Sequence, residues 1–339
     1  MNDNYESQPL TAISRGETVE SLHRGHIAVM DGDGLTAHLG DPRVVTYMRS
    51  CAKPFQAMAF IEGGISEKFN LNDREIAAMC ASHYAEDFHL EAVLSILEKA
   101  GVTVKDLLCG DVYSMKDEVA SMQVRAGLKP GPLFNDCSGK HAGYLAFCVH
   151  RGLTVRNYTS IYHPVHRPVI ELIGRFCEID PKFIQTGVDG CSLPTFALPL
   201  ESIARAFMRL ADHERLPSSD RDSAARIYRA MTSHPEMVAG SGGFCTEIMK
   251  ATSGRMVAKV GAEGVYAIGV RDAGIGLAVK VEDGAFRALW PSVVELLLQL
   301  DLIGKEELRR LNNFHTMAVL NDRGSVVGEV RPRFKVIRR

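Results

Sequence analysis

A serine and a lysine three residues apart, Ser50 and Lys53 in Arg49-Ser-Cys-Ala-Lys-Pro54, could carry out nucleophilic catalysis. This spacing brings both side chains to one side of a helical turn. A serine hydroxyl attacks poorly until a base takes its proton, and a desolvated lysine, its pKa lowered from about 10.4, can be that base. Pro54 fits best in a first helical turn, so we expect the pair at a helix start, where backbone N–H groups could stabilise an oxyanion. Taken alone, the pattern also fits an ordinary solvated helix start.

Two later residues strengthen the catalytic interpretation. Ser82, in Cys80-Ala-Ser-His83, follows a predicted helix and offers a second hydroxyl, and Lys259, in Lys259-Val-Gly261, lies on a predicted strand. The order Ser-x-x-Lys, Ser, Lys-x-Gly parallels the three motifs of penicillin-interacting serine enzymes. The parallel is loose, because position 260 is valine rather than a hydroxyl residue and Ser-Asp-Asn does not occur.

A second candidate centre combines Asn135-Asp-Cys-Ser-Gly-Lys-His141 with Asp189-Gly-Cys191. Two thiolates and a nitrogen ligand suit zinc. Spacing alone favours Cys137 with His141 over Lys140, because a lysine must lose its proton to coordinate a metal. Buried cysteines near polar loops more often serve packing, so a metal site and a packing role both stay open.

The composition is that of a soluble globular protein. Of 339 residues, 46% are hydrophobic and 24% charged, and the formal net charge of −2 indicates neither a nucleic-acid nor an anionic-membrane partner. The polar N-terminus does not resemble a signal peptide, and no apolar run approaches the about 18 residues of a membrane helix. We therefore expect the cytoplasm, where the eight cysteines would be buried hydrophobes, metal ligands or reactive thiols.

Strand patterns occupy both ends of the chain. Residues 11–48 are expected to form strands, with a hairpin turn at Asp31-Gly-Asp-Gly34 and a strand over 44–48 that leads into the serine motif. Residues 255–285 are predicted to form a meander of three short strands, broken at glycine turns.

Helical periodicity predominates over residues 54–235. Helices are predicted over residues 73–80, 91–99, 201–215, 293–300 and 305–311. This order predicts an α+β fold, with a mixed antiparallel sheet from both termini flanked by helices and an inserted helical subdomain. Residues 1–53 and 250–339 form the predicted sheet-containing region and residues 54–249 the mainly helical region. Together they are expected to make one catalytic unit with a cleft where they meet.

Six motifs, in this order, resemble those of the rhizobial-type L-asparaginases, the class-three or asparaginase II family typified by the Rhizobium etli enzymes. They are Arg49-Ser-Cys-Ala-Lys-Pro-Phe-Gln56, Cys80-Ala-Ser-His83, Asn135-Asp-Cys-Ser-Gly-Lys-His-Ala-Gly143, Val188-Asp-Gly-Cys191, His234-Pro-Glu-Met-Val-Ala-Gly240 and Lys259-Val-Gly-Ala-Glu-Gly264. The resemblance runs from about residue 15 to about residue 330, and the third and sixth motifs are its specific parts.

This resemblance implies a fold similar to that of the serine β-lactamases and serine-dependent glutaminases. It implies hydrolysis of L-asparagine to L-aspartate and ammonia, by a homodimer with one site per subunit. Ser50 with Lys53, and Ser82 with Lys259, match the family's two serine–lysine pairs. Relatives often carry Ser-Gly-Glu-Pro where this chain has Tyr84-Ala-Glu-Asp-Phe88, and an aspartate where it has Cys245.

The resemblance also implies a zinc ion, because Cys137, Lys140 and Cys191 match the family's metal-binding residues. His141 then becomes a neighbour of the metal rather than a ligand. Asp189 matches an aspartate that orients the metal shell or the substrate. We expect zinc to shape the site, so that its removal weakens substrate binding more than it slows chemistry.

Free asparagine is a zwitterion, so its site needs a cation for the α-carboxylate and an anion for the α-ammonium. Arg49 and Asp189 are the candidates for these contacts. His83 and His141, which adjoin the two motifs, are the histidines that we expect to contact substrate.

The expected reaction is acyl transfer, in which Ser50, activated by Lys53, attacks the side-chain amide carbon; Ser82 with Lys259 is the alternative pair. Three other functions stay open. A glutaminase would accept one more methylene, which a pocket discriminates by about 1–3 kcal/mol. A penicillin-interacting hydrolase would use the same Ser-x-x-Lys. A non-enzymatic, zinc-stabilised amino-acid sensor would bind asparagine without releasing ammonia.

Overall fold

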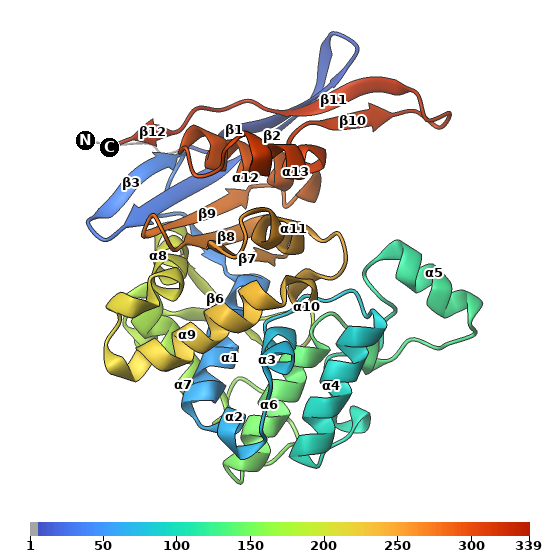
Figure 1. Ribbon diagram of the computed structural model, residues 1–339, viewed down its shortest axis with the longest axis vertical. Helices are drawn as coiled ribbons and strands as arrows, with labels where there is room; N and C mark the ends of the chain where they lie inside the picture. The colour runs from blue at the N-terminus through green and yellow to red at the C-terminus, as the bar shows by residue number, and fades with distance from the viewer. Residues whose placement is uncertain (1–5) are drawn as a thin grey trace. The chain divides into compact units, whose positions relative to one another are not determined.

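The computed structural model describes residues 6–339, which fall into two compact units (Figure 1). Unit 1 contains the described part of Met1–Cys51 together with Leu198–Asp212 and Glu247–Arg339. Unit 2 contains Ala52–Ala197 and His213–Thr246. The first five residues of the predicted sheet-containing region lie outside the described residues.

Unit 1 is built on a nine-stranded sheet with the order β10-β11-β1-β2-β9-β8-β7, in which β3 pairs with both β2 and β12. Its strands are β1 (Gln8–Arg15), β2 (Thr18–Asp31), β3 (Gly34–Leu39), β7 (Met256–Gly261), β8 (Val265–Val270), β9 (Ile275–Val281), β10 (Met317–Leu320), β11 (Val326–Pro332) and β12 (Ile337–Arg338). The paired strands run antiparallel, and β2 is long enough to pair with β1 through its first half and with β3 and β9 through its second. The predicted α+β class, with a sheet drawn from both ends of the chain, is confirmed.

Helix α8 (Leu200–Ala211) lies directly on this sheet because two paired glycines leave room for it. Gly269 on β8 is opposite Gly276 on β9. A Cβ atom on either glycine would lie 2.0 Å from a backbone oxygen of the helix, that of Phe207 or Ala204. Any larger residue at these positions would push the helix off the sheet.

Helix α12 (Phe286–Gln299) packs on the opposite face, followed by α13 (Lys305–His315). Tyr266 on β8 points away from α8 by strand alternation and contacts the Trp290 ring edge-on, with ring centroids 6.0 Å apart. The predicted start of this helix at residue 293 is wrong, because the helix passes through Pro291. Proline is disfavoured inside helices, and here the packing of the helix on the sheet outweighs that preference.

Unit 2 is mainly helical. Its helices are α1 (Lys53–Glu62), α2 (Ile65–Lys68), α3 (Asp73–Met79), α4 (Asp87–Ala100), α5 (Asp117–Arg125), α6 (Ser138–His150), α7 (His166–Cys177), α9 (Ser218–Ser233) and α10 (Pro235–Ala239). Helices α1 and α6 are buried along almost their whole length and meet through Phe60 and Tyr144, with ring centroids 4.6 Å apart. Asn72 caps α3 together with Glu75, and left-handed Gly101 ends α4 as predicted.

Short elements complete the chain. They are β4 (Val45–Tyr47), β5 (Gln185–Val188), β6 (Pro194–Pro199), α11 (Phe244–Ala251) and the 3-10 helices η1 (Arg49–Ala52), η2 (Val104–Asp106), η3 (Pro132–Phe134), η4 (Pro181–Phe183) and η5 (His213–Arg215). Sequence patterns missed the hairpin of β5 and β6 and the C-terminal strands β10 to β12.

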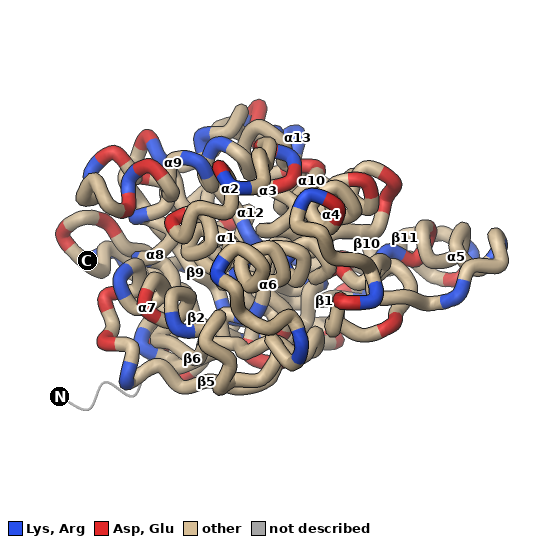
Figure 2. The backbone as a smooth tube through the Cα atoms, turned by 90° about the horizontal axis from the view of Figure 1, so that it is seen from below, with Lys and Arg blue, Asp and Glu red and all other residues tan. Residues whose placement is uncertain are grey.

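Figure 2 shows basic and acidic residues interspersed along the helices and loops of both units, in keeping with the small net charge. Among residues 6–339, no helix is long and apolar enough to cross a membrane.

Candidate active site

The serine–lysine motif lies at a helix start, as predicted. Ser50 is in the 3-10 turn η1, and Lys53 is the first residue of α1, with Pro54 in the first turn. Arg49, just before the serine, has a left-handed backbone with φ of 49°. Non-glycine residues in this conformation are uncommon, and they often gather at functional sites.

In unit 1, the turn that carries Ser50 packs against the strand that carries Lys259. The Cys51 thiol donates to the backbone oxygen of Lys259 at 3.2 Å. A Cβ atom on Gly261 would lie 2.7 Å from the Met48 oxygen, so this glycine allows the close approach. Lys259 is fully buried on β7, and its side-chain nitrogen donates to the Val260 oxygen at 2.8 Å. Packing thus brings the turn of Ser50 and the strand of Lys259 together.

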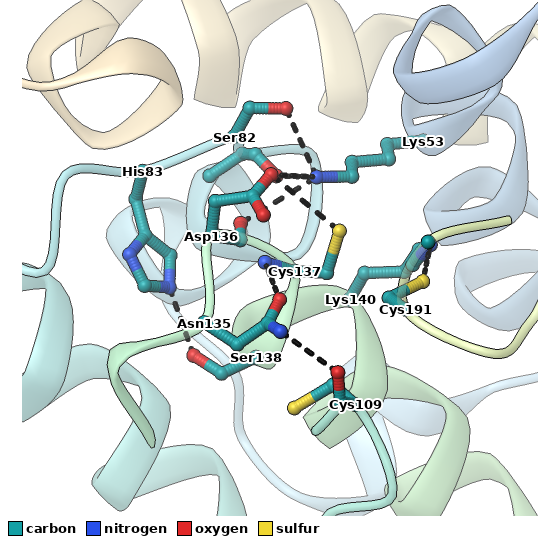
Figure 3. A network of polar contacts seen from close by, with 12 residues as sticks. Lys53, Ser82, His83, Cys109, Asn135, Asp136, Cys137, Ser138, Lys140 and Cys191 are labelled. Atoms are coloured by element: carbon teal, nitrogen blue, oxygen red, sulfur yellow. Dashed lines mark hydrogen bonds and ion pairs between the residues drawn. The ribbon is translucent and has the colours of Figure 1, made fainter. Parts of the chain in front are cut away.

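In unit 2, the fully buried Lys53 ammonium is held by acceptors on three residues (Figure 3). Its nitrogen is 2.6 Å from the Ala81 backbone oxygen, 3.0 Å from the Ser82 hydroxyl and 3.3 Å from a carboxylate oxygen of Asp136. The residue after η3 and the residues after α3 therefore meet at the start of α1. A lysine and a serine hydroxyl at hydrogen-bond distance can pass a proton between them.

The charge state of Lys53 differs from the one expected from the sequence. Burial lowers the pKa of the Lys53 ammonium, but a hydrogen bond to the Cys137 sulfur and the charge of the Asp136 carboxylate raise it, and the net shift is upward. Lys53 is therefore an ammonium at neutral pH. In this state it can donate a proton through Ser82, and it cannot serve as the neutral base that the sequence suggested.

Cys137, Lys140 and Cys191 form a second buried cluster next to this lysine, shown in Figure 3. Cys137 precedes α6, and Lys140 follows within the first turn of that helix. Cys191 lies in the tight turn between β5 and β6, which Asp189 closes. The Lys140 nitrogen is 2.9 Å from the Cys191 sulfur and 3.8 Å from an Asp189 carboxylate oxygen.

The three members of this cluster carry different charges. A hydrogen bond from the Cys137 thiol, together with the Lys140 ammonium, lowers the pKa of Cys191 despite its burial. The same hydrogen bond and burial raise the pKa of Cys137. Burial lowers the pKa of Lys140, but the adjacent sulfurs and Asp189 raise it well above its usual value. Cys191 is thus a thiolate, Cys137 a thiol and Lys140 an ammonium.

The cluster fits a zinc ion if Lys140 takes part. Among the described residues, no group of three or more His, Cys, Asp or Glu side chains is placed to hold a metal. Cys137 and Cys191 supply two sulfur donors, and the amine of Lys140, 2.9 Å from the Cys191 sulfur, is the nitrogen donor. Two sulfurs and a nitrogen match the ligand preference of zinc, once the amine has lost its proton.

Both histidines expected to contact substrate are fully buried. His83 Nδ1 accepts the Ala85 N–H, so Nε2 carries the proton and donates to the Ser138 hydroxyl at 2.8 Å. Burial lowers the pKa of His83 to about 3. His141 Nδ1 is 2.7 Å from the Tyr158 hydroxyl, and burial lowers its pKa as well. These contacts tie both rings to the protein frame, and their contact with substrate stays a prediction.

Asp136 is the functional candidate that sequence reasoning missed. Its carboxylate lies 3.3 Å from the Lys53 ammonium and accepts the Cys137 thiol at 3.5 Å. The available signal was an acidic residue directly before the cysteine of a specific motif. Spacing did not reveal its role, because Lys53 is far away in the sequence.

The chain was compared with curated proteins and with solved structures. A search of curated proteins gives no match. Similar solved structures include a β-lactamase from Mycobacterium bovis (15% identity, 82% of this chain and 95% of that chain, TM-score 0.43) and simvastatin synthase from Aspergillus terreus (12%, 76% and 86%, 0.39). Another is a Bacillus glutaminase (16%, 82% and 91%, 0.35). All three TM-scores lie below 0.5.

The family comparison covers nearly the whole chain. Residues 11–332 match the model of the family described as L-asparaginase II. The match includes all the proposed serine, lysine and cysteine positions. The chain therefore belongs to the L-asparaginase II family.

Proposed function

We propose that this protein hydrolyses L-asparagine to L-aspartate and ammonia by acyl transfer to a serine. Its family supports an amidohydrolase activity. The observation that carries the proposal is the contact of 3.0 Å between the buried Lys53 ammonium and the Ser82 hydroxyl. Such a pair can protonate a departing amide nitrogen, which otherwise leaves very poorly.

In the proposed acylation, the Ser50 oxygen bonds to the side-chain amide carbon of the substrate. Its proton passes to Lys259, our candidate base, because the turn of Ser50 packs on the strand of Lys259. Lys53 then donates a proton through Ser82 to the nitrogen, so that the C–N bond breaks and ammonia leaves.

Deacylation reverses these proton movements. Water attacks the acyl-serine ester and gives its proton to Lys53, now neutral. Ser50 recovers its proton from Lys259, and aspartate leaves. The cycle adds one water and restores both lysines, so the proposed steps balance.

The substrate and metal contacts belong to the same proposal. Zinc held by Cys137, Lys140 and Cys191 would supply a fixed positive charge and a Lewis acid. Arg49 is our candidate for the substrate α-carboxylate and Asp189 for the α-ammonium. We also propose that the protein acts as a homodimer with one site per subunit.

The decisive test measures ammonia release from L-asparagine and L-glutamine. Ser50→Ala, Ser82→Ala and Lys259→Ala should each lower kcat/KM by on the order of 10³-fold or more, because each removes a reacting group. Ser218→Ala, at an exposed position on α9, is the matched control and should keep full activity. Full activity in all three site variants would sink the serine mechanism. A higher kcat/KM for L-glutamine would make the protein a glutaminase.

A trapping experiment identifies the nucleophile. Ser82→Ala should still acylate slowly, and mass spectrometry after acid quenching should then find the acyl group on Ser50. An acyl group on Ser82 of the wild type would reverse the assignment of the two serines.

A further inference from the structure

Asp136 is a charged residue at the centre of the site that the proposed reaction does not use. It lies between η3 and α6, and its Oδ2 atom is 3.3 Å from the Lys53 nitrogen. The same oxygen accepts the Cys137 thiol, at an S–O distance of 3.5 Å. The carboxylate therefore contacts both the lysine and the sulfur cluster (Figure 3).

We propose that Asp136 is a positioning residue, whose carboxylate holds the Lys53 nitrogen against the Ser82 hydroxyl. The inference rests on the proposed function, since it concerns the lysine–serine relay that protonates the departing ammonia. It adds a residue that neither the motifs nor the family match assigns.

The first support is the geometry of the ammonium. An ammonium group has three hydrogens, and Lys53 directs them to Ala81, Ser82 and Asp136. The first two acceptors are neutral, and the third carries the charge that attracts the ammonium most strongly. Without that acceptor, rotation about the side-chain bonds of Lys53 can carry the nitrogen away from the serine.

The second support is the rigid anchoring of the Asp136 backbone. The Asn135 side chain donates to the Cys109 oxygen at 2.8 Å and accepts the Cys137 N–H at 3.0 Å. The backbone oxygen of Asp136 itself accepts the His83 N–H at 3.2 Å. Bonds on both sides of Asp136, and one from its own peptide, fix the place from which the carboxylate projects.

The third support is burial. Lys53 is 0% exposed, so water cannot replace a lost partner. A buried ammonium that loses its counter-charge is strongly destabilised, so Lys53 no longer has a favourable charge contact that holds it at this place. The relay therefore depends on a carboxylate at this position and not merely on a polar side chain.

A crystal structure of Asp136→Asn tests the positioning directly and needs no activity. The amide keeps the size of the side chain and removes its charge. We expect the distance from Lys53 Nζ to Ser82 Oγ to lengthen from 3.0 Å to beyond hydrogen-bond range. An unchanged distance would overturn the proposal even if the protein proves to hydrolyse another amide. If the wild type hydrolyses neither amide while the distance lengthens, the proposed function falls and the positioning stands.

Kinetics then separate positioning from stability. Asp136→Asn should lower kcat for L-asparagine by about 100-fold, the usual effect of a displaced reacting group, with KM little changed. Glu75→Gln is the control, because the Glu75 carboxylate is also bonded to a lysine, Lys99 at 2.7 Å, and lies outside the catalytic cluster. It should lower the thermal midpoint and leave kcat intact. Equal losses of kcat in both variants would show that the ion pair of Asp136 with Lys53 only stabilises the fold.

Two further measurements keep the proposal open to refutation if Asp136→Asn does not fold. Asp136→Glu keeps the charge and moves the carboxylate by about 1.5 Å, so it should fold and lose kcat. Formate should restore part of the kcat of Asp136→Ala in a saturable way, with no effect on Glu75→Ala. Wild-type kcat in Asp136→Glu, or no rescue by formate, contradicts the proposal. The proposal is also contradicted if Asp136→Glu loses as much bound zinc as Cys137→Ala, because that result would make the carboxylate a part of the metal site.

Discussion

Zinc binding to the sulfur cluster is expected to release two protons per ion between about pH 6 and pH 8. The apoprotein holds one proton on Cys137 and one extra proton on Lys140, because the pKa of each is raised, while the lowered pKa of Cys191 leaves a thiolate. All three groups must be free of these protons to bind the metal. The two positive charges of zinc thus replace two protons, and the cluster keeps its net charge.

The size of the effect follows from that count. Each released proton makes the zinc affinity rise tenfold per pH unit, so two make it rise about 100-fold, or about 2.7 kcal/mol. Acid should therefore strip the metal steeply. The direction is fixed, since protons compete for the ligands and the affinity falls as pH falls.

Titration calorimetry in buffers of different ionisation enthalpy measures the proton count directly. The slope of the observed enthalpy against buffer ionisation enthalpy should have a magnitude of two for the wild type, and its sign should be negative because the buffer takes up the released protons. The magnitude should also be two for Lys99→Met, which removes a lysine bonded to Glu75 outside the cluster. A magnitude of one would show that Lys140 keeps its proton and is not a ligand. A slope near zero would show that zinc does not bind to this cluster.

Three further predictions concern the fold. His83 and His89 are neutral in the folded protein, with pKa values of about 3 and about 4 caused by burial, against 6.5 when unfolded. Their contribution to the free energy of unfolding is complete above pH 6.5 and is lost as the pH falls, because the unfolded state then binds protons that the folded state does not. Urea unfolding should therefore give a free energy of unfolding about 5 kcal/mol lower at about pH 4.5 than at about pH 7.5 from this pair. An unchanged free energy of unfolding contradicts the assignment. Gly276→Ala should lower the free energy of unfolding by about 1–3 kcal/mol or more, because the added methyl would lie 2.0 Å from a backbone oxygen of helix α8. Gly32→Ala is the control and should change it little, because no atom lies within 4 Å of the added methyl. Equal thermal midpoints for the two variants would disprove the packing argument. Ala85→Gly should raise the thermal midpoint slightly. Ala85 has a left-handed backbone with φ of 54°, which costs about 1–2 kcal/mol for an alanine, and the larger entropy of glycine in the unfolded chain cancels only part of the gain from removing this strain. A lower midpoint would show that the loss of the methyl group outweighs the relief of strain.

Local patterns predicted much of the sheet. The hairpin at residues 31–34 and the meander of β7, β8 and β9 agree with the structure to within about a residue, because turn glycines and alternation act over short distances. β5 and β6 were missed for physical reasons. β5 is almost wholly exposed and carries no alternating pattern, while β6 is a short buried run between two prolines, which periodicity does not distinguish from a helix.

The site was predicted in its residues more than in its contacts. Motif order selected Ser50, Lys53, Ser82 and Lys259, but spacing pairs a lysine with its sequence neighbour, and the partner of Lys53 in unit 2 is Ser82. The upward shift of the Lys53 pKa depends on Asp136 and Cys137, the two residues just before α6. Such charge effects between residues far apart in the sequence arise only in the folded protein, so the local composition does not reveal them.

The sheet of unit 1 imposes an order on folding during synthesis. Ala28 on β2 pairs with Ala278 on β9, 278 − 28 = 250 residues later. At about 5–20 residues per second, a ribosome needs about 12–50 s to make that partner. During this time the apolar inner strands at the N-terminus lack their neighbour at the centre of the sheet. The N-terminal strands should therefore be the part of the nascent chain most dependent on chaperones, and a truncation before β9 should leave them prone to aggregate.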